Sequence, residues 1–174
     1  MESQPMLIPK TIDDSEICLR CLVNPLQYNL KKGRFQPSAV LPPPDRDRND
    51  VSLSRLKYIS SIEVCIKRGE SIPMGSNTFC GIASFTRRDV SEVNTITNDS
   101  IVSADIEYAP MHQDEYVPLS VDVFVEDPNV DKPDHAELRY NQPYNRNDVV
   151  NTSFRIYANE LIKRLKIEYL KPQA

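Results

Sequence analysis

The sequence predicts a single α+β domain, with a mixed or largely antiparallel sheet and an amphipathic C-terminal helix packed on it. Segments of strand composition fill the middle of the chain, at 78–85, 100–109 and 117–126. Apolar residues at helical spacing lie before and after them, near 53–68 and 151–170. Strands grouped between flanking helices are typical of α+β domains. A chain of 174 residues, 40% of them hydrophobic, is long enough for one domain with a buried core.

The first half of the chain combines a predicted strand with a predicted helix. Residues 16–23 (EICLRCLV) are rich in Cys, Leu and Val and predict a first strand. Apolar residues at helical spacing over 53–68 then predict a helix that ends before Gly69, since glycine is typical of helix ends. The β-branched residues leave a strand over 59–66 as an alternative. The apolar positions of this helix are Leu53, Leu56, Ile59, Ile62 and Ile66.

The second half holds the clearest strand pattern, over 117–126, and the longest helical stripe. The short segment 135–140 (HAELRY), bounded by Pro133 and Pro143, predicts an edge strand or a single turn. The strand pattern at 117–126 comes from Val117, Leu119, Val121, Val123 and Val125. The stripe of the final helix, about 151–170, comes from Phe154, Tyr157, Ala158, Leu161, Leu165 and Tyr169.

We expect the domain to occupy residues 16–174. Residues 1–15 are polar and predict an N-terminal tail. Three prolines at 42–44, followed by alternating Asp and Arg, predict a Pro-rich exposed loop at about 36–50.

Composition disfavours two classes of partner. The net charge of −4 and the pI of about 5.3 argue against a general nucleic-acid coat or a membrane-surface protein. No stretch of the sequence approaches the roughly 18 apolar residues that a membrane span needs. The N-terminus has neither a basic start nor an apolar run, so no secretory signal is visible. Four cysteines in such a chain predict reduced thiols and a cytoplasmic location.

The segment His135-Ala136-Glu137 raises the question of a zinc site. In zinc deaminases the His of a His-x-Glu motif binds the metal, the Glu is the general acid/base, and a Cys-x-x-Cys motif follows. Here the Cys-x-x-Cys pair, Cys18 and Cys21, precedes the histidine by more than one hundred residues, and no proline precedes it. We therefore predict no zinc site and no cofactor, with the cysteines as framework thiols.

Acidic residues around His135 raise the separate possibility of a cation held by oxygen ligands. They are Asp127, Asp131, Asp134 and Glu137. The glycine that a calcium loop needs at its sixth position is missing from this segment. We predict that no metal binds, and that the His135 ring bonds to a nearby carboxylate or carbonyl group.

An enzymatic hypothesis starts from four short segments. "LRC" in the first predicted strand, the basic and aromatic "QYNLKKGRF", then "SLSR" and a late acidic residue resemble ADP-ribosyltransferase-like folds. The resemblance implies that a basic residue in an early strand holds a dinucleotide and that a late Glu orients its ribose. The matching positions are Arg20, Ser52 or Ser54, and Glu137, and His135 completes the candidate catalytic set.

A basic segment with aromatic residues supports a second alternative, contact with nucleic acid by charge and stacking. It is also the candidate surface for a protein partner, because charge is segregated along the chain. Residues 101–138 hold ten acidic residues and one Lys, whereas residues 31–57 hold seven basic and three acidic residues. The candidate partner-binding residues are Tyr28, Lys31, Lys32, Arg34, Phe35, Arg46 and Arg48.

The succession "CLRCLVNP", "GRFQPSAVLPPP", "DVSLSRL" and "KPDHAEL" resembles a group of small bacterial proteins with a late HA-x-[IL] motif. The resemblance implies an accessory role beside toxin or phage-defence genes. We therefore expect a non-enzymatic subunit that binds a larger protein or a second copy of itself. A nucleotide-processing enzyme and a nucleic-acid-contacting subunit remain the alternatives.

Overall fold

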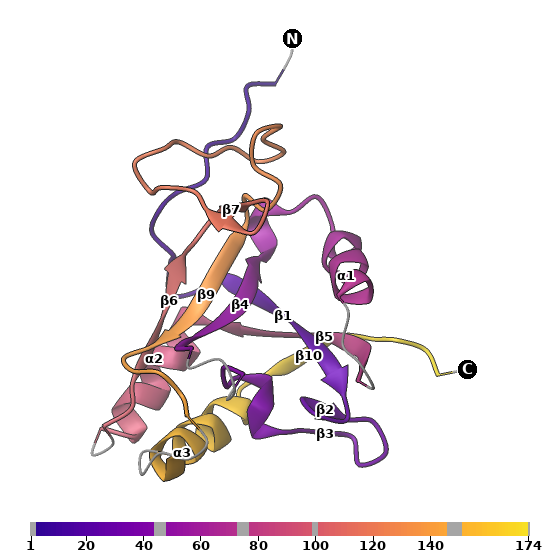
Figure 1. Cartoon of the computed structure of the whole chain (residues 1–174), viewed down its shortest axis with the longest axis vertical. Helices are drawn as coiled ribbons and strands as arrows, with labels where there is room; N and C mark the ends of the chain where they lie inside the picture. The colour runs from indigo at the N-terminus through magenta and orange to yellow at the C-terminus, as the bar shows by residue number, and fades with distance from the viewer. Residues whose placement is uncertain (1–2, 44–47, 73–76, 99–100, 146–150, 174) are drawn as a thin grey trace.

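The computed structural model describes residues 3–43, 48–72, 77–98, 101–145 and 151–173, which form a six-stranded sheet with helices on both faces (Figure 1). The strand order is β10-β5-β1-β4-β9-β6, and all neighbouring strands are antiparallel, so the α+β prediction is confirmed. The strands are β1 (Ile17–Asn24), β4 (Asp50–Arg55), β5 (Thr78–Thr86), β6 (Ala104–Tyr108), β9 (His135–Tyr140) and β10 (Lys166–Leu170). The helices are α1 (Ile62–Ser71), α2 (Arg87–Ile96) and α3 (Asn151–Ile162).

Two short hairpins and two 3₁₀ helices complete the fold. One hairpin pairs β2 (Tyr28–Asn29) with β3 (Arg34–Phe35), and the other pairs β7 (Met111–His112) with β8 (Glu115–Tyr116). The second hairpin turns through Gln113 and Asp114, whose φ angles of 51° and 64° fit the tight two-residue loops that join antiparallel strands. The 3₁₀ helices are Pro37–Ala39 and Leu56–Tyr58.

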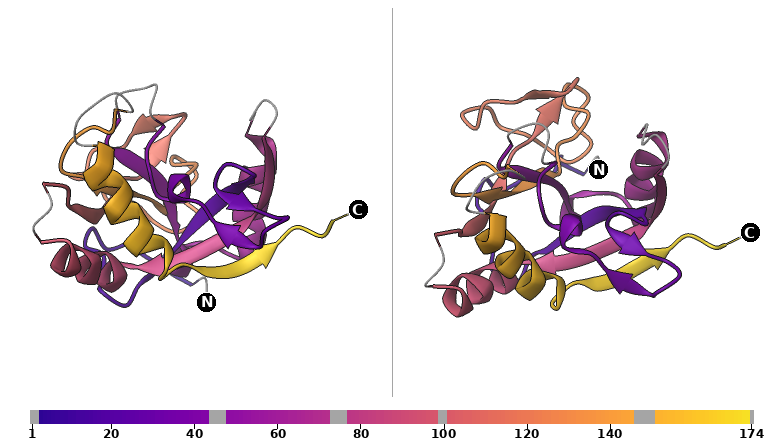
Figure 2. Two further views of the ribbon diagram at one scale, coloured as in Figure 1. Left: turned by 90° about the horizontal axis from the view of Figure 1, so that it is seen from below. Right: turned by 60° about the horizontal axis from the view of Figure 1, so that its bottom comes forward.

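The helices cover the two faces of the sheet unequally (Figures 1 and 2). Helices α2 and α3 pack on one face, where the Tyr140 ring lies 5.2 Å from that of Phe154 and 5.5 Å from that of Tyr157. Helix α1 packs on the other face against β1 and β5. On that face no helix of the described chain covers β4 and β9. This half of the face is therefore open to other groups.

The alternation of side chains along β9 decides what this open half displays. Ala136, Leu138 and Tyr140 belong to the core on the α3 face. Because successive side chains of a strand point to opposite faces, His135 and Glu137 lie on the other side of the sheet. Both are nevertheless buried, with 7% and 1% of their surface exposed. Residues 135–140 were predicted as an edge strand or a turn. They form the strand β9, which is internal to the sheet and lies between β4 and β6.

Of the four segments predicted as strands, three contain strands and one does not. Residues 16–23 and 78–85 correspond to β1 and β5, and 100–109 contains the shorter β6. Residues 117–126 form no strand, although their alternation is the clearest in the sequence; Phe124 makes an isolated bridge to Leu7. Pro118 lacks an N–H group to donate, and Glu126 has a φ angle of 59°, so extended pairing cannot continue.

The helix boundaries also differ from prediction. The predicted helix at 53–68 is split, because its first residues complete β4 and α1 begins at Ile62. The C-terminal helix is present and buries Phe154, Tyr157, Ala158 and Leu161 as expected, but it ends at Ile162. Residues 166–170 instead pair with β5 as β10, since an open sheet edge offers them hydrogen-bond partners. Helix α2 was not predicted, although Thr86 and Asp89 form a capping box at its start.

Two segments expected to be exposed contribute to the core. In the N-terminal segment, expected to be a polar tail, Ile8 and Ile12 are 1% and 5% exposed. In the described part of the Pro-rich loop, Ala39, Val40 and Leu41 are buried against the sheet. Although both segments are largely polar in sequence, their apolar residues are buried, because they cover apolar surface on the α3 face of the sheet.

Candidate functional site

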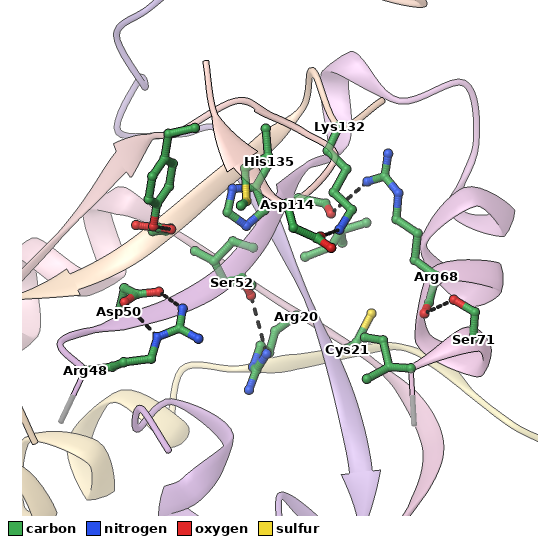
Figure 3. A pocket seen from close by; sticks show the side chains of 17 residues that line it. Arg20, Cys21, Arg48, Asp50, Ser52, Arg68, Ser71, Asp114, Lys132 and His135 are labelled. Atoms are coloured by element: carbon green, nitrogen blue, oxygen red, sulfur yellow. Dashed lines mark hydrogen bonds and ion pairs between the residues drawn. The ribbon is translucent and has the colours of Figure 1, made fainter. Parts of the chain in front are cut away.

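A cleft of about 680 Å³ opens on the α1 face of the sheet, over β1, β4 and β9 (Figure 3). Residues of α1 line one side of it and residues of the hairpin β7–β8 line the other. Its volume falls in the range of about 300–1,000 Å³ that is usual for small-molecule sites. All candidate catalytic residues predicted from the sequence line this cleft: Arg20, Ser52, Ser54, His135 and Glu137.

The register of β4 against β9 brings four of these residues together. Ser52 lies directly opposite Glu137, and Ser54 lies directly opposite His135. Because directly paired residues of antiparallel strands point to the same face, all four side chains occupy the cleft side of the sheet. The sequence supplies the residue types, but the strand pairing brings together positions more than eighty residues apart.

Arg20 lies where β1 and β4 stop pairing, beyond the pairs Cys18–Arg55 and Leu19–Ser54. Its Nε donates to the carbonyl oxygen of Ala39 at 3.0 Å, and its Nη1 approaches the carbonyl oxygen of Ser52 at 3.5 Å. No carboxylate of the described residues forms an ion pair with it. Burial lowers the pKa of Arg20, although the neighbouring Cys21 acts in the opposite direction. The guanidinium remains a cation, because arginine does not lose its proton in proteins.

The other cations of the cleft are neutralised by carboxylates. Arg48 donates to both carboxylate oxygens of Asp50, and this hydrogen bond raises the pKa of Arg48. Lys132 lies 3.4 Å from a carboxylate oxygen of Asp114. A further pair joins Arg68 of α1 to Asp134, at 2.8 and 2.9 Å. Burial, the largest single cause, lowers the pKa of Arg68, but the hydrogen bond and the charge of Asp134, together with the nearby thiols of Cys65 and Cys21, outweigh it, so the pKa is raised.

Glu137 is a buried carboxylate with two partners. The hydroxyl of Tyr116, on the hairpin β7–β8, donates to its Oε1, and Arg139 of the same strand donates to its Oε2. Burial, and then the bond to Glu137, raises the pKa of Tyr116 to about 12, so the hydroxyl keeps its proton at neutral pH. The hairpin is thereby attached to the sheet at the edge of the cleft.

His135 bonds to a carbonyl group, as its sequence context predicted. Its Nδ1 lies 2.6 Å from the carbonyl oxygen of Ala109. Burial lowers the pKa of the His135 ring, while the Ala109 carbonyl and the charges of Glu137 and Asp134 act in the opposite direction. The ring is therefore neutral at physiological pH.

The candidate partner-binding residues do not form one surface. Tyr28 is buried and packs edge to face against Phe35, with ring centroids 5.1 Å apart, so neither ring is free to stack on a base. Exposed basic residues, among them Lys31 and Lys32, remain at the tip of this hairpin. Arg48 lines the cleft instead. Arg46 lies outside the described residues.

The cysteines and acidic residues are not grouped as the ligands of a metal site would be. Cys18 faces the core under α3, whereas Cys21 packs with the cluster under α1. Burial raises the pKa of Cys18 to about 12 and that of Cys65 to about 11, which keeps both thiols protonated. Within residues 3–43, 48–72, 77–98, 101–145 and 151–173, no group of three or more His, Cys, Asp or Glu side chains could hold a metal ion.

Sequence reasoning missed several residues of the cleft. Arg68, Lys132 and Tyr116 line it, yet Arg68 and Tyr116 lie in no recognisable motif, and Lys132, in the segment KPDHAEL, was not predicted as a site residue. They reach the cleft from α1, from the loop before β9 and from the hairpin β7–β8, and this proximity depends on tertiary packing alone.

The chain matches no protein-family model, no curated protein and no solved structure. Among the residues placed by the structure, no helix combines the length and the apolar character needed to cross a membrane.

Proposed function

We propose that the chain is a nucleotide-processing enzyme, similar to an ADP-ribosyltransferase in the residue types of its cleft. One observation carries the proposal. Residues Arg20, Ser52, Ser54, His135 and Glu137, which come from β1, β4 and β9, line one cleft of small-molecule size. These residues were selected from the sequence for their chemistry, and unrelated surface residues would not be expected to line the same cleft.

The roles follow from the charges of these groups. Arg20 offers a guanidinium without a carboxylate partner among the described residues, and phosphate is a suitable anion for it. Glu137 is a buried carboxylate that can accept hydrogen bonds from ribose hydroxyl groups. Ser52 and Ser54 can donate or accept hydrogen bonds beside it. A dinucleotide such as NAD is the first candidate substrate, and nicotinamide release is the reaction to look for.

The test compares two glutamates that face each other across β6 and β9. Glu107 lies directly opposite Glu137, and its carboxylate is 3.0 Å from Arg139, but it does not line the cleft. We expect wild type and Glu107→Gln to release nicotinamide from NAD, with or without an acceptor protein. Glu137→Gln should lower the rate by about 10²-fold or more. Absence of turnover by folded wild type with NAD and other nucleotides would exclude this function.

A second candidate function, binding of a larger protein or of a second copy of the chain, rests on exposed apolar side chains. Met6 and Leu7 are 55% and 48% exposed, and Leu119 and Val121 are 49% and 47% exposed. The two segments are neighbours, since Leu7 forms a bridge with Phe124. Exposed apolar residues grouped on one surface are typical of interaction sites.

Light scattering and co-purification test this second function. We expect Leu7→Asp combined with Leu119→Asp to abolish self-association or partner capture. The control is Ile96→Asp on α2, since Ile96 is equally exposed at 55% but belongs to another element. A monomer that captures the same proteins before and after the double substitution would argue against an interaction surface here.

A further inference from the structure

The side chain of His135 presents one ring nitrogen to the cleft and uses the other for the fold. The carbonyl oxygen of Ala109, 2.6 Å from Nδ1, can only accept a hydrogen bond. Nδ1 must therefore carry the hydrogen in the neutral ring. This leaves Nε2 with its lone pair, and the ring lines the cleft between β4 and the hairpin β7–β8 (Figure 3).

Nε2 has no hydrogen-bond partner in the part of the chain that the structure describes. Nε2 is not among the described side-chain atoms that are both buried and without a partner, so this lone pair is open to the cleft and can accept a hydrogen bond there. Ser54, the residue opposite His135, accepts from Arg68 at 3.4 Å through its Oγ, and among the described residues neither Ser54 nor Ser52 bonds to the ring. A hydroxyl group of a ligand or a water molecule is therefore the chemical group that fits beside Nε2.

The charged groups around the ring are mostly engaged with one another. Glu137, on the same strand, bonds to Tyr116 and Arg139. Asp134, which precedes the ring, bonds to Arg68 of α1, and Lys132 pairs with Asp114 of the hairpin. The two carboxylates lie close enough to favour a positive ring, and Lys132 opposes it. An imidazolium formed during a reaction would thus be stabilised by two fixed negative charges and by the Ala109 carbonyl.

We propose that Nε2 of His135 is the base that removes the proton from the attacking hydroxyl group in the cleft. This role rests on the proposed function. In the step, the oxygen of water or of an acceptor hydroxyl forms a bond to the anomeric carbon of the nicotinamide ribose. The bond from that carbon to the nicotinamide nitrogen breaks, and its electron pair stays with nicotinamide, which leaves neutral. The proton of the attacking group passes to Nε2.

Nuclear magnetic resonance tests the hydrogen-bonding part without turnover. The sequence has two histidines, so His112→Asn leaves His135 as the single histidine signal. We expect ¹⁵N spectra to show a protonated Nδ1 and an unprotonated Nε2 at neutral pH. Addition of ADP-ribose, a hydroxyl-bearing product analogue, should shift the Nε2 resonance more than that of Nδ1. A ring protonated on Nε2, or an unchanged Nε2 resonance at saturating ADP-ribose, would overturn the proposal.

Activity then separates a base from a binding group. His135→Asn keeps a side-chain N–H that can reach Ala109 but removes Nε2, so the fold should persist. We expect kcat for NAD to fall by about 10²–10⁴-fold with little change in KM. In the matched control, His112→Asn, kcat should be unchanged. Wild-type kcat/KM should fall as pH decreases through a pKa below 6.5, because a proton then occupies Nε2.

The outcomes distinguish this proposal from the function on which it rests. Turnover by wild type that survives unchanged in His135→Asn would overturn the role of His135 and leave the nucleotide-processing function intact. No turnover of any nucleotide by wild type would reject the function, and with it the base. Loss of turnover in His135→Asn with an intact circular dichroism spectrum, together with the Nε2 shift, is the expected result.

Discussion

Arg55 and Glu16 form a buried ion pair with two hydrogen bonds, of 2.6 Å from Nε and 2.8 Å from Nη2. Their side chains are 0% and 7% exposed. The same guanidinium donates to the carbonyl oxygens of Pro9 and Thr11 at 2.6 and 3.1 Å. One side chain of the internal strand β4 therefore fastens the N-terminal segment to the sheet.

We expect Arg55→Ala to lower the free energy of unfolding by about 3–5 kcal/mol, because it leaves the Glu16 carboxylate buried without its partner. Urea unfolding measures the change. Lys163→Ala is the control, since its pair with Glu160 lies at the exposed C-terminal end of α3 and is worth at most about 0.5 kcal/mol. Equal effects of the two substitutions would mean that the buried pair does not hold the segment.

The bond from Tyr116 to Glu137 predicts a pH-dependent contribution to stability. We expect Tyr116→Phe to cost about 0.5–1.5 kcal/mol at neutral pH, because one hydrogen bond is lost. Tyrosine in the unfolded chain ionises near pH 10, whereas Tyr116 in the folded chain ionises at about 12. The unfolded chain thus loses its proton first, so this contribution is complete below pH 10 and disappears as the pH rises towards 12.

Urea unfolding of wild type and Tyr116→Phe at pH 8 and pH 11 measures this dependence. The difference between the two proteins should shrink at pH 11. Glu137→Gln removes the negative charge beside the hydroxyl, so tyrosinate absorbance should report a lower pKa for Tyr116 in that variant. A difference that grows with pH would contradict the assignment.

Gly81 of β5 packs so closely against the edge strand β10 that a side chain at position 81 would push β10 away. A Cβ atom on Gly81 would lie 2.4 Å from the backbone oxygen of Tyr169. We expect Gly81→Ala to cost about 1–3 kcal/mol, as overpacking does. Amide exchange should show the loss of protection concentrated in β10. Gly33→Ala is the control: its φ of +58° strains an alanine, but the nearest atom is 3.9 Å away, so β10 should stay protected.

Part of the candidate site was predictable because its residues carry recognisable chemistry. Arg20, Ser54, His135 and Glu137 were chosen for residue type and order, and all line the cleft. The bond of His135 to a carbonyl group also agrees with prediction. Arg68 and Tyr116 were not predictable, because a lone Arg on a helix and a Tyr on a hairpin have no distinguishing neighbours in the sequence.

The sequence by itself determined the α+β class, the strands β1 and β5 and the apolar face of α3, because local periodicity records which side of an element is buried. The tertiary structure alone decided that 117–126 is not a strand and that 166–170 is one. Alternating apolar residues indicate that a segment is able to form a strand. A strand forms only where a neighbouring strand exchanges backbone hydrogen bonds with it over several residues. The cleft depends on the same non-local choice, since it arises from the pairing of β4 with β9.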